Sequence, residues 1–263
     1  MNIAMLGLGE VGSALKQLIG DKHQVFVREL TYNQVTDQHI DVAHVSIPYN
    51  QKFESIVVSF VEEIKPDLTI INSTVKPGTT EAIFKKTNRP IVHSPFMGVH
   101  PIKPKHEFIH QGVDLRLADY FDRFTKIIGP VDAKSGKLAR AHFKSLGLKT
   151  QLYKSPLETE LAKVLCTTYY GWNILFEKWV HQLCEQTGAN FDQVYTDYNH
   201  NYNNGYKEVL PHVVRPVLKH HDGPIGGHCV IPNADIIQDW LSDEFSNFLL
   251  TQNQKLTKKS GLK

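Results

Sequence analysis

The sequence predicts an α/β protein, with a Rossmann-like, doubly wound and mainly parallel sheet followed by a smaller all-helical domain. Short apolar runs alternate with amphipathic segments over the first half of the chain, which is typical of parallel strands joined by helices. A glycine-rich turn lies between the first apolar run and the first helical segment. A long helical pattern begins near Ser155, so we predict a sheet domain over 1–154 and a helical domain, with a long central helix and a cysteine loop, over 155–263.

Composition describes an ordinary soluble globular protein. Hydrophobic residues make up 41% of the 263 residues, charged residues 21%, and the formal net charge is +2. A net charge this small does not predict a basic surface that binds nucleic acid. We see no transmembrane run and no signal peptide, and the odd number of cysteines favours reduced thiols. We therefore expect a cytoplasmic protein without a nucleic-acid or membrane partner.

The elements of the first half follow one another in a regular order. Strands are predicted over 2–7, 23–29, 42–47, 68–72, 90–94, 124–129 and 148–153, and helices over 13–19, 52–64 and 133–146. The loop 95–123 is rich in His and Pro, and a loop of this length is often functional. The histidines in and before it are candidate bases, although loop histidines are more often polar surface: His93, His100, His106 and His110.

The first turn reads Gly7-Leu-Gly-Glu-Val-Gly12, the G-x-G-x-x-G spacing of a dinucleotide-binding turn. Gly7 permits a tight turn, Gly9 lets a pyrophosphate approach the backbone, and Gly12 lets helix and strand pack closely. Glu10 and Val11 lie where the helix N-terminus faces the phosphates. These five residues form the predicted cofactor turn; the alternative is a purely structural glycine turn.

The cofactor predicted by the next elements is NAD. Glu29 ends the second strand, where a carboxylate accepts hydrogen bonds from the ribose hydroxyls and repels a 2′-phosphate. Arg28 beside it weakens the preference for NAD over NADP. Because ligands bind at the carboxyl ends of parallel strands, Pro48, Ser73 and Thr74 complete the predicted cofactor edge.

A helix-start signal opens the second half. Ser155 is the predicted N-cap, with Pro156 at the first helical position and Glu158 three residues on, as in a capping box. The helix should run to about Thr187, and its apolar residues cover more than one stripe, so its own domain or a second subunit should bury it. We interpret these residues, and Cys166 and Cys184, as core: Leu161, Val164, Leu165, Tyr169, Trp172, Leu175, Phe176, Trp179 and Leu183.

Two later segments receive weaker predictions. The stretch 191–206 is rich in Asn and aromatic residues, and either a substrate-side loop or a helix–loop connection would fit it. The stretch 236–251 is predicted to form one closing helix.

Between these segments, Gly223-Pro-Ile-Gly-Gly-His-Cys229 surrounds one cysteine with glycines. Glycines that open the backbone around a thiol favour a nucleophile. A structural thiol is one alternative. A metal site with His220, His221 and His228 is another, although no paired CxxC or HxxxH spacing supports it, and we predict no metal.

Four stretches together resemble the UDP-glucose/GDP-mannose dehydrogenase family, whose NAD-dependent enzymes oxidise the C6 alcohol of a nucleotide sugar to a carboxylate. The resemblance implies that activity, a sugar nucleotide as small-molecule substrate, and a homodimer built on the long helix. The GGHC segment is most similar to the branch that acts on N-acetylated sugar nucleotides. The matching stretches are Gly7–Gly12, Ser73–Thr80, Glu158–Lys163 and Gly223–Cys229.

The resemblance also implies residue roles. Cys229 matches the nucleophile that becomes a thioester, Lys163 matches the lysine beside the reacting oxygen, and Thr74 matches a threonine near the nicotinamide. Thr167 and Asn233 occupy the positions of two further catalytic residues, where the family has asparagine and aspartate.

Other departures from the family make this a short, divergent member. Phe96 stands where the family has the glutamate that assists thioester hydrolysis, and the chain ends one helix after Cys229, without the family's C-terminal nucleotide-binding domain. Two alternatives therefore stay open: a two-electron dehydrogenase of a small alcohol or hydroxy acid, with Lys163 as acid and base, and a non-catalytic NAD-binding protein.

Overall fold

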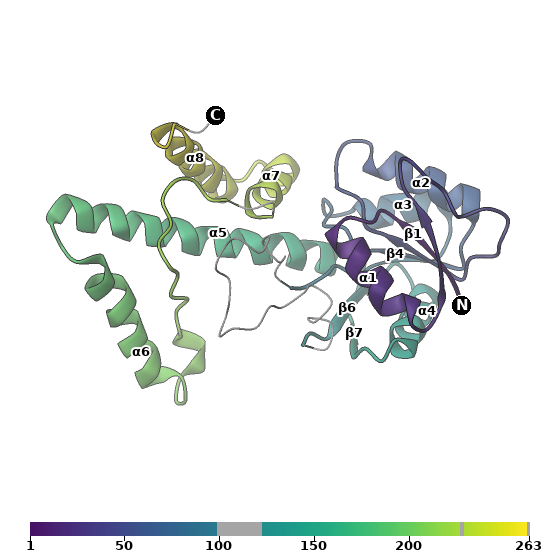
Figure 1. The fold of residues 1–263 in the computed structure, drawn as a ribbon, viewed down its shortest axis with the longest axis horizontal. Coiled ribbons are helices and arrows are strands. Elements are labelled where there is room, and N and C mark those ends of the chain that lie inside the picture. Colours follow the sequence, from purple (N-terminus) through teal and green to yellow (C-terminus); the bar gives the residue numbers. More distant parts are fainter. Residues whose placement is uncertain (99–122, 227–228, 262–263) are drawn as a thin grey trace. The chain divides into compact units, whose positions relative to one another are not determined.

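The computed structural model describes residues 1–98, 123–226 and 229–261. The chain divides into two compact units, Met1–Lys163 and Val164–Lys263 (Figure 1). Most of the predicted loop 95–123 falls outside the described residues, and so do His100, His106, His110 and His228.

One sheet forms the centre of the first unit. In the described part of the chain its strand order is β2-β1-β3-β4-β5-β6-β7, and every neighbouring pair is parallel except β5 and β6. The order reverses between β1 and β3, as in other doubly wound sheets, so the predicted fold class is confirmed. The strands are β1 (Asn2–Leu6), β2 (Gln24–Arg28), β3 (Val42–Val45), β4 (Leu68–Ile71), β5 (Ile91–His93), β6 (Lys126–Pro130) and β7 (Thr150–Leu152).

Helices cover both faces of this sheet, and the two-residue period of the strands decides which side chains each face presents. Ile3 and Met5 of β1 share a buried cluster with residues of α1 and α4, whereas Ala4 and Leu6 share the other cluster with residues of α2 and α3. The helices are α1 (Glu10–Gly20), α2 (Phe53–Ile64), α3 (Thr79–Thr87) and α4 (Ala133–Ser145).

Helix α3 is absent from the sequence-based prediction. Its β-branched start gives a weak local helix signal, and its first-turn N–H groups are satisfied from far along the chain. The buried carboxylate of Glu160 accepts hydrogen bonds from the backbone N–H groups of Gly78, at 2.6 Å, and Thr80, at 2.9 Å. A cap that comes from a distant residue leaves no trace in the local sequence.

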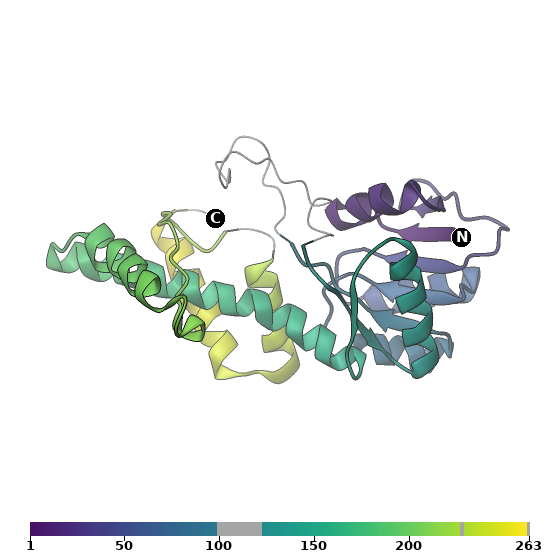
Figure 2. The ribbon, with the colours of Figure 1, turned by 90° about the horizontal axis from the view of Figure 1, so that it is seen from below.

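The long helix α5 (Pro156–Thr187) has the predicted bounds and is the longest helix in Figure 2. The capping box forms at its start, because the backbone N–H of Ser155 donates to Glu158 Oε2 at 2.8 Å and that of Leu157 donates to Ser155 Oγ at 3.2 Å. The helix stops before Gly188, which has a left-handed φ of 74°.

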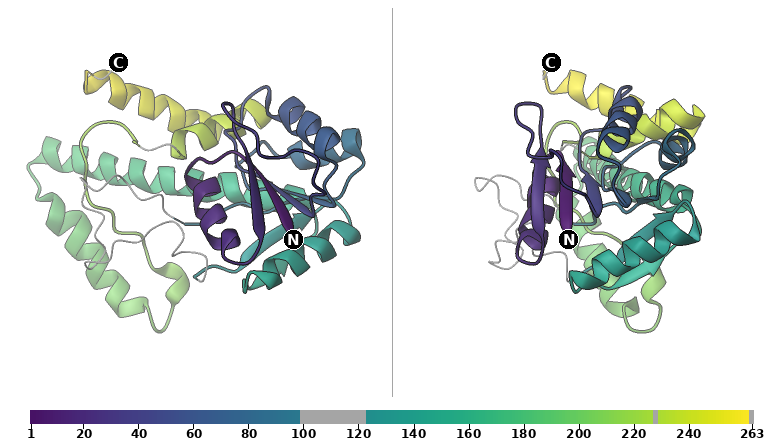
Figure 3. Two further views of the ribbon diagram at one scale, coloured as in Figure 1. Left: turned by 45° about the vertical axis from the view of Figure 1, so that its right-hand side comes forward. Right: turned by 90° about the vertical axis from the view of Figure 1, so that its right-hand side faces the viewer.

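The rest of the second unit is helical. The stretch 191–206 contains a π-helical turn (Asp192–Asp197) and α6 (Tyr198–Tyr206), which excludes the loop interpretation. A 3₁₀ turn (Pro211–Val213) follows. The single closing helix is wrong, because two helices, α7 (Val230–Leu241) and α8 (Glu244–Lys259), stand there (Figure 3). Ser242 has a left-handed backbone conformation, which ends α7. The Asp243 side chain accepts a hydrogen bond from the Ser246 N–H and so caps the start of α8.

The core interpretation of α5 is only partly right. Val164, Leu175 and Cys184 are buried, but Cys166 is exposed, which corrects its assignment to the core. Several aromatic and apolar side chains of this helix are also exposed: Leu165, Tyr169, Tyr170, Phe176, Trp179 and Leu183. No helix among the described residues is long and apolar enough to cross a membrane.

Candidate functional site

The glycine turn lies where the sheet order reverses. Gly7 has a φ of 94°, and a Cβ added to it would lie 2.6 Å from the carbonyl oxygen of Ser46. A Cβ on Gly12 would lie 2.1 Å from the carbonyl oxygen of Gly7, whereas one on Gly9 would meet no atom within 4 Å. Two glycines are thus required by the fold and the third faces open space, which fits a backbone that a pyrophosphate approaches.

The acidic residue after β2 contacts this turn. Glu29 accepts a hydrogen bond from the backbone N–H of Leu8. Arg28 Nη1 pairs with Glu63 Oε2 at 2.6 Å. Because the carboxylate of Glu63 balances the charge of Arg28, Arg28 attracts a 2′-phosphate less strongly than an unpaired arginine would.

The remaining predicted cofactor residues lie on the same edge of the sheet. Glu10 is exposed in the first turn of α1, Val11 is half-buried, and Pro48 is exposed after β3. Ser73 Oγ donates to the carbonyl oxygen of Ile47 at 2.7 Å, which ties the end of β4 to the end of β3, and Thr74 is half-buried.

Lys163 lies on α5 and contacts the segment after β5. Its Nζ donates to the carbonyl oxygen of Phe96 at 2.7 Å. The Phe96 side chain is buried in the cluster that contains Ile3 and Phe143. The position at which the family has a glutamate is therefore filled by a core side chain.

His93, the candidate base within the described residues, is buried at the end of β5. Its Nδ1 contacts Thr159 Oγ1 at 2.8 Å, and its Nε2 contacts the carbonyl oxygen of Ser73 at 3.1 Å. Burial lowers the pKa of His93 to about 3. A neutral imidazole with both nitrogens engaged is a structural link between β5, α5 and Ser73.

In the second unit, the structure brings Thr167 and Asn233 together. Asn233 Nδ2 donates to Thr167 Oγ1 at 2.6 Å. Cys229 is half-buried and lies directly before the first residue of α7. A helix start favours negative charge, because its first N–H groups have no helical acceptors.

Gly171 is a residue that the sequence analysis missed. A Cβ there would lie 2.5 Å from Val230 Cγ1, so this glycine lets α5 approach the start of α7. In the sequence, a glycine inside a strong helical pattern could have indicated this close approach of two helices.

One of the histidines considered as metal ligands, His220, has other side-chain contacts. His220 Nδ1 pairs with the buried carboxylate of Glu177 at 2.5 Å, and the ring of His220 stacks on His181. The carbonyl oxygen of His221 accepts from Lys178. His220 is thus held against α5 by a carboxylate.

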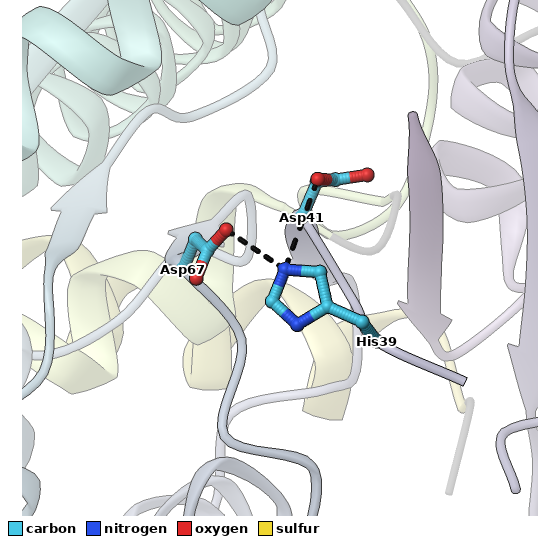
Figure 4. A group of neighbouring side chains, drawn as sticks. All are labelled: His39, Asp41 and Asp67. Atoms are coloured by element: carbon cyan, nitrogen blue, oxygen red, sulfur yellow. Dashed lines mark hydrogen bonds and ion pairs between the residues drawn. The ribbon is translucent and has the colours of Figure 1, made fainter. Parts of the chain in front are cut away.

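One group of metal-ligand type occurs among the described residues: His39, Asp41 and Asp67 (Figure 4). His39 Nε2 lies 3.0 Å from Asp67 Oδ2 and 3.9 Å from Asp41 Oδ1, and His39 and Asp67 are exposed. These residues precede β3 and β4, at the edge opposite the glycine turn, and form a surface ion-pair group.

Comparison with known proteins also points to a dinucleotide-dependent dehydrogenase, as the glycine turn does. No protein-family model matches the chain. It is 27% identical over 222 residues to the UDP-N-acetyl-D-mannosamine dehydrogenase of Methanocaldococcus jannaschii, covering 76% of this chain and 45% of that protein. It is 28% identical over 202 residues to the protein of the same name from Methanococcus maripaludis, covering 73% and 40%. The chain thus spans less than half the length of these curated relatives.

Solved structures share the fold. UDP-D-ManNAc dehydrogenase of Pyrococcus horikoshii superposes with a TM-score of 0.72 at 17% identity, over 100% of this chain and 73% of that one. The 3-hydroxyisobutyrate dehydrogenase of Mycobacterium tuberculosis gives 0.68 at 13% identity, over 98% and 94%. Together with the four motifs, the curated relatives confirm the resemblance of this chain to the nucleotide-sugar dehydrogenases.

Proposed function

We propose that the chain is an NAD-dependent oxidoreductase that acts on the primary alcohol of a nucleotide sugar. The observation that carries the proposal is the glycine turn, in which Gly7 and Gly12 are sterically required and Gly9 faces open space. The names of the curated relatives, UDP-N-acetyl-D-mannosamine dehydrogenases, support a nucleotide sugar as the substrate class.

We assign NAD binding to the predicted domain 1–154. The turn Gly7–Gly12, with Glu10 and Val11, would hold the pyrophosphate, and Glu29 would bind the adenosine ribose. Pro48, Ser73 and Thr74 would line the nicotinamide end. The bound cofactor supplies the hydride acceptor.

Lys163 is the proposed acid and base. As hydride leaves the alcohol carbon, the hydroxyl proton passes to the neutral amine of Lys163, and an aldehyde results. The contact with the Phe96 carbonyl orients the Lys163 amine.

Cys229 is the proposed nucleophile for a second oxidation. Its thiolate adds to the aldehyde carbon, and the resulting oxyanion takes up one proton to give a thiohemiacetal. Loss of a second hydride and the hydroxyl proton leaves a thioester on Cys229, which water then hydrolyses to a carboxylate. Thr167 and Asn233 would support this site as a hydrogen-bonded pair. Neither Phe96 nor Asn233 supplies a carboxylate to activate water, so we expect thioester hydrolysis to be slow.

The exposed aromatic side chains of α5 support a homodimer. A dimer that buries Phe176 and Trp179 explains an apolar helix surface that is exposed among the described residues. Light scattering at micromolar concentration tests this, and a monomer mass would refute it.

The function is tested by mixing the protein with NAD and a panel of alcohols and following NADH. We expect turnover of UDP-N-acetyl-D-mannosamine and tighter binding of NAD than NADP in calorimetry. The panel includes 3-hydroxyisobutyrate, because the fold is shared with that dehydrogenase over 94% of its length. Oxidation of this hydroxy acid alone would favour the two-electron alternative. NAD binding without any turnover would favour a non-catalytic protein.

A further inference from the structure

A groove lies at the outer edge of the sheet, between helix α4 and strand β7, which stand next to each other in Figure 1. Strand β7 is the last of the sheet, and no strand in the described part of the chain pairs with its other side. The groove has a volume of about 970 Å³. Its lining includes no residue assigned to NAD or to the chemistry, so it is separate from the candidate site.

The outer edge of β7 presents backbone groups that are open to a further strand. The carbonyl oxygen of Lys149 and the N–H of Tyr153 both bond to β6, each at 2.8 Å. Because backbone groups alternate in direction along a strand, those of Thr150 and Leu152 point away from β6. Among the described residues these outward groups have no hydrogen-bond partner, which leaves a template for strand pairing.

Five basic side chains line the same groove. All five are exposed, and none forms an ion pair with another described residue. Three of them are spaced three and four residues apart on α4, which puts them on one side of that helix, and two flank β7. They are Lys137, Arg140 and Lys144 of α4, and Lys149 and Lys154 beside β7.

The two acids near these cations are engaged elsewhere. Asp132 accepts a hydrogen bond from the backbone N–H of Ser135 at 2.7 Å and so caps α4. Glu158, whose carboxylate interacts with the charge of Lys154, is bound to Ser155 in the capping box of α5. The groove therefore keeps an excess of positive charge.

Lysines on an edge strand often serve only to keep another strand from pairing with it. Lys149 and Lys154 fit that role. The three cations of α4 do not, because they stand on the neighbouring helix and not on the edge itself. Like charges also disfavour a second copy of this edge as the occupant, so a strand that pairs here must carry acidic side chains.

We propose that the α4–β7 groove binds an acidic, extended segment of another protein, which adds a strand to the outer edge of β7. Its backbone bonds to the outward groups of Thr150 and Leu152, and its acidic side chains, at alternate positions, face the cations of α4. The row from Lys137 to Lys144 is about 10 Å long, the length of about three extended residues. A nucleic acid fits less well, because its phosphates would meet the outward carbonyl oxygens.

The charge in the groove is tested with a fluorescein-labelled peptide of about ten alternating Glu and Thr residues, long enough to pass the whole edge. Fluorescence anisotropy measures its affinity for the full chain at low salt. Arg140→Glu should weaken binding at least about tenfold. Lys134→Glu is the matched control, because Lys134 is exposed on the same helix but does not line the groove. It should weaken binding by less than about twofold.

The strand pairing is tested at Thr150. Thr150→Pro removes an outward N–H that the sheet does not use, and an edge strand tolerates proline there. Thr150→Val keeps the N–H and the β-branched shape. We expect at least about tenfold weaker binding for Pro and less than about twofold for Val. If the Pro variant does not fold, the peptide with an N-methylated backbone replaces it and should bind the unmodified chain at least about tenfold more weakly than its parent.

Three results would overturn the proposal: no binding of the peptide, an equal loss in Arg140→Glu and Lys134→Glu, or full affinity after the N–H groups are removed. Tighter binding of a single-stranded DNA of the same charge would also overturn it, in favour of a nucleic-acid partner. NAD affinity should be the same in every variant, because none of these residues is assigned to the cofactor. The groove is thus judged independently of the proposed function.

Discussion

The glycine turn of the first unit and the cysteine segment of the second are held in place by different means. At the turn, backbone atoms leave no room for a Cβ on Gly7 or Gly12. Near Cys229, side-chain pairs do the positioning: Asn233 binds Thr167, and His220 binds Glu177. Backbone crowding rejects any larger residue, whereas one hydrogen-bonded pair can replace another. This explains how the turn can match the family that the chain resembles while residues of the proposed chemistry depart from it.

The interiors of the units differ as well. The first unit buries the bases His44, His93, His142 and Lys126, and burial lowers the pKa of each. It also buries Glu160, whose pKa burial raises. The described interior of the second unit contains the aliphatic cluster of Leu175, Ile225, Val230, Ala234 and Leu249, against which Trp172 packs. The first unit should therefore respond more strongly to pH.

Acid should give the largest difference between the units. In the unfolded chain a histidine binds a proton below about pH 6.5, whereas His44, His93 and His142 stay neutral in the folded chain. The free energy of unfolding is therefore highest above that pH and decreases as the pH falls. We expect a loss of about 4 kcal/mol between pH 7.5 and 5.5 for the three together. Hydrogen exchange of first-unit amides measures it, and His142→Gln should reduce the slope by about a third. Equal acid sensitivity in both units would contradict the comparison.

Gly12→Val should destabilise the first unit by about 3 kcal/mol, because the new side chain overlaps the Gly7 carbonyl. Gly9→Ala is the matched control: its Cβ enters open space, so the free energy of unfolding should change by less than about 0.5 kcal/mol. Calorimetry should nevertheless show weaker NAD binding to Gly9→Ala. An unchanged NAD affinity would mean that this turn does not bind the pyrophosphate.

Glu160→Gln should lower the free energy of unfolding by about 2 kcal/mol, because an amide cannot accept hydrogen bonds from Gly78 and Thr80 as the carboxylate does. Glu81→Gln, in an exposed pair with Lys85, should change it by less than about 0.5 kcal/mol. Denaturant unfolding at pH 7.5 compares the two. Equal effects would mean that Glu160 does not cap α3.

Much of this architecture could be predicted because its causes are local. The alternating pattern indicated the strands, the glycine spacing indicated the turn, and Ser155 with Glu158 indicated the start of α5. Features that depend on distant partners could not be predicted. The cap of α3 comes from Glu160, and the burial of Lys126 depends on carbonyls more than thirty residues away along the chain.

The candidate site divides in the same way. Glu29 and Lys163 could be named from spacing and resemblance, but the pairing of Arg28 with Glu63 and of Thr167 with Asn233 requires the fold. The exposure of Cys166 and Trp179 was also out of reach, because the helical pattern cannot tell which apolar face the chain itself covers.

The most direct test of the central claim measures NADH formed per sugar nucleotide consumed, together with the intact mass of the protein, after mixing with NAD and UDP-N-acetyl-D-mannosamine. We predict a burst of two NADH per chain and an acyl adduct on Cys229, since no carboxylate at Phe96 or Asn233 activates water for its release. Cys229→Ser should bind NAD normally, form no adduct and carry out no second oxidation. Sustained release of two NADH per substrate without an adduct, or unchanged turnover in Cys229→Ser, would contradict the account.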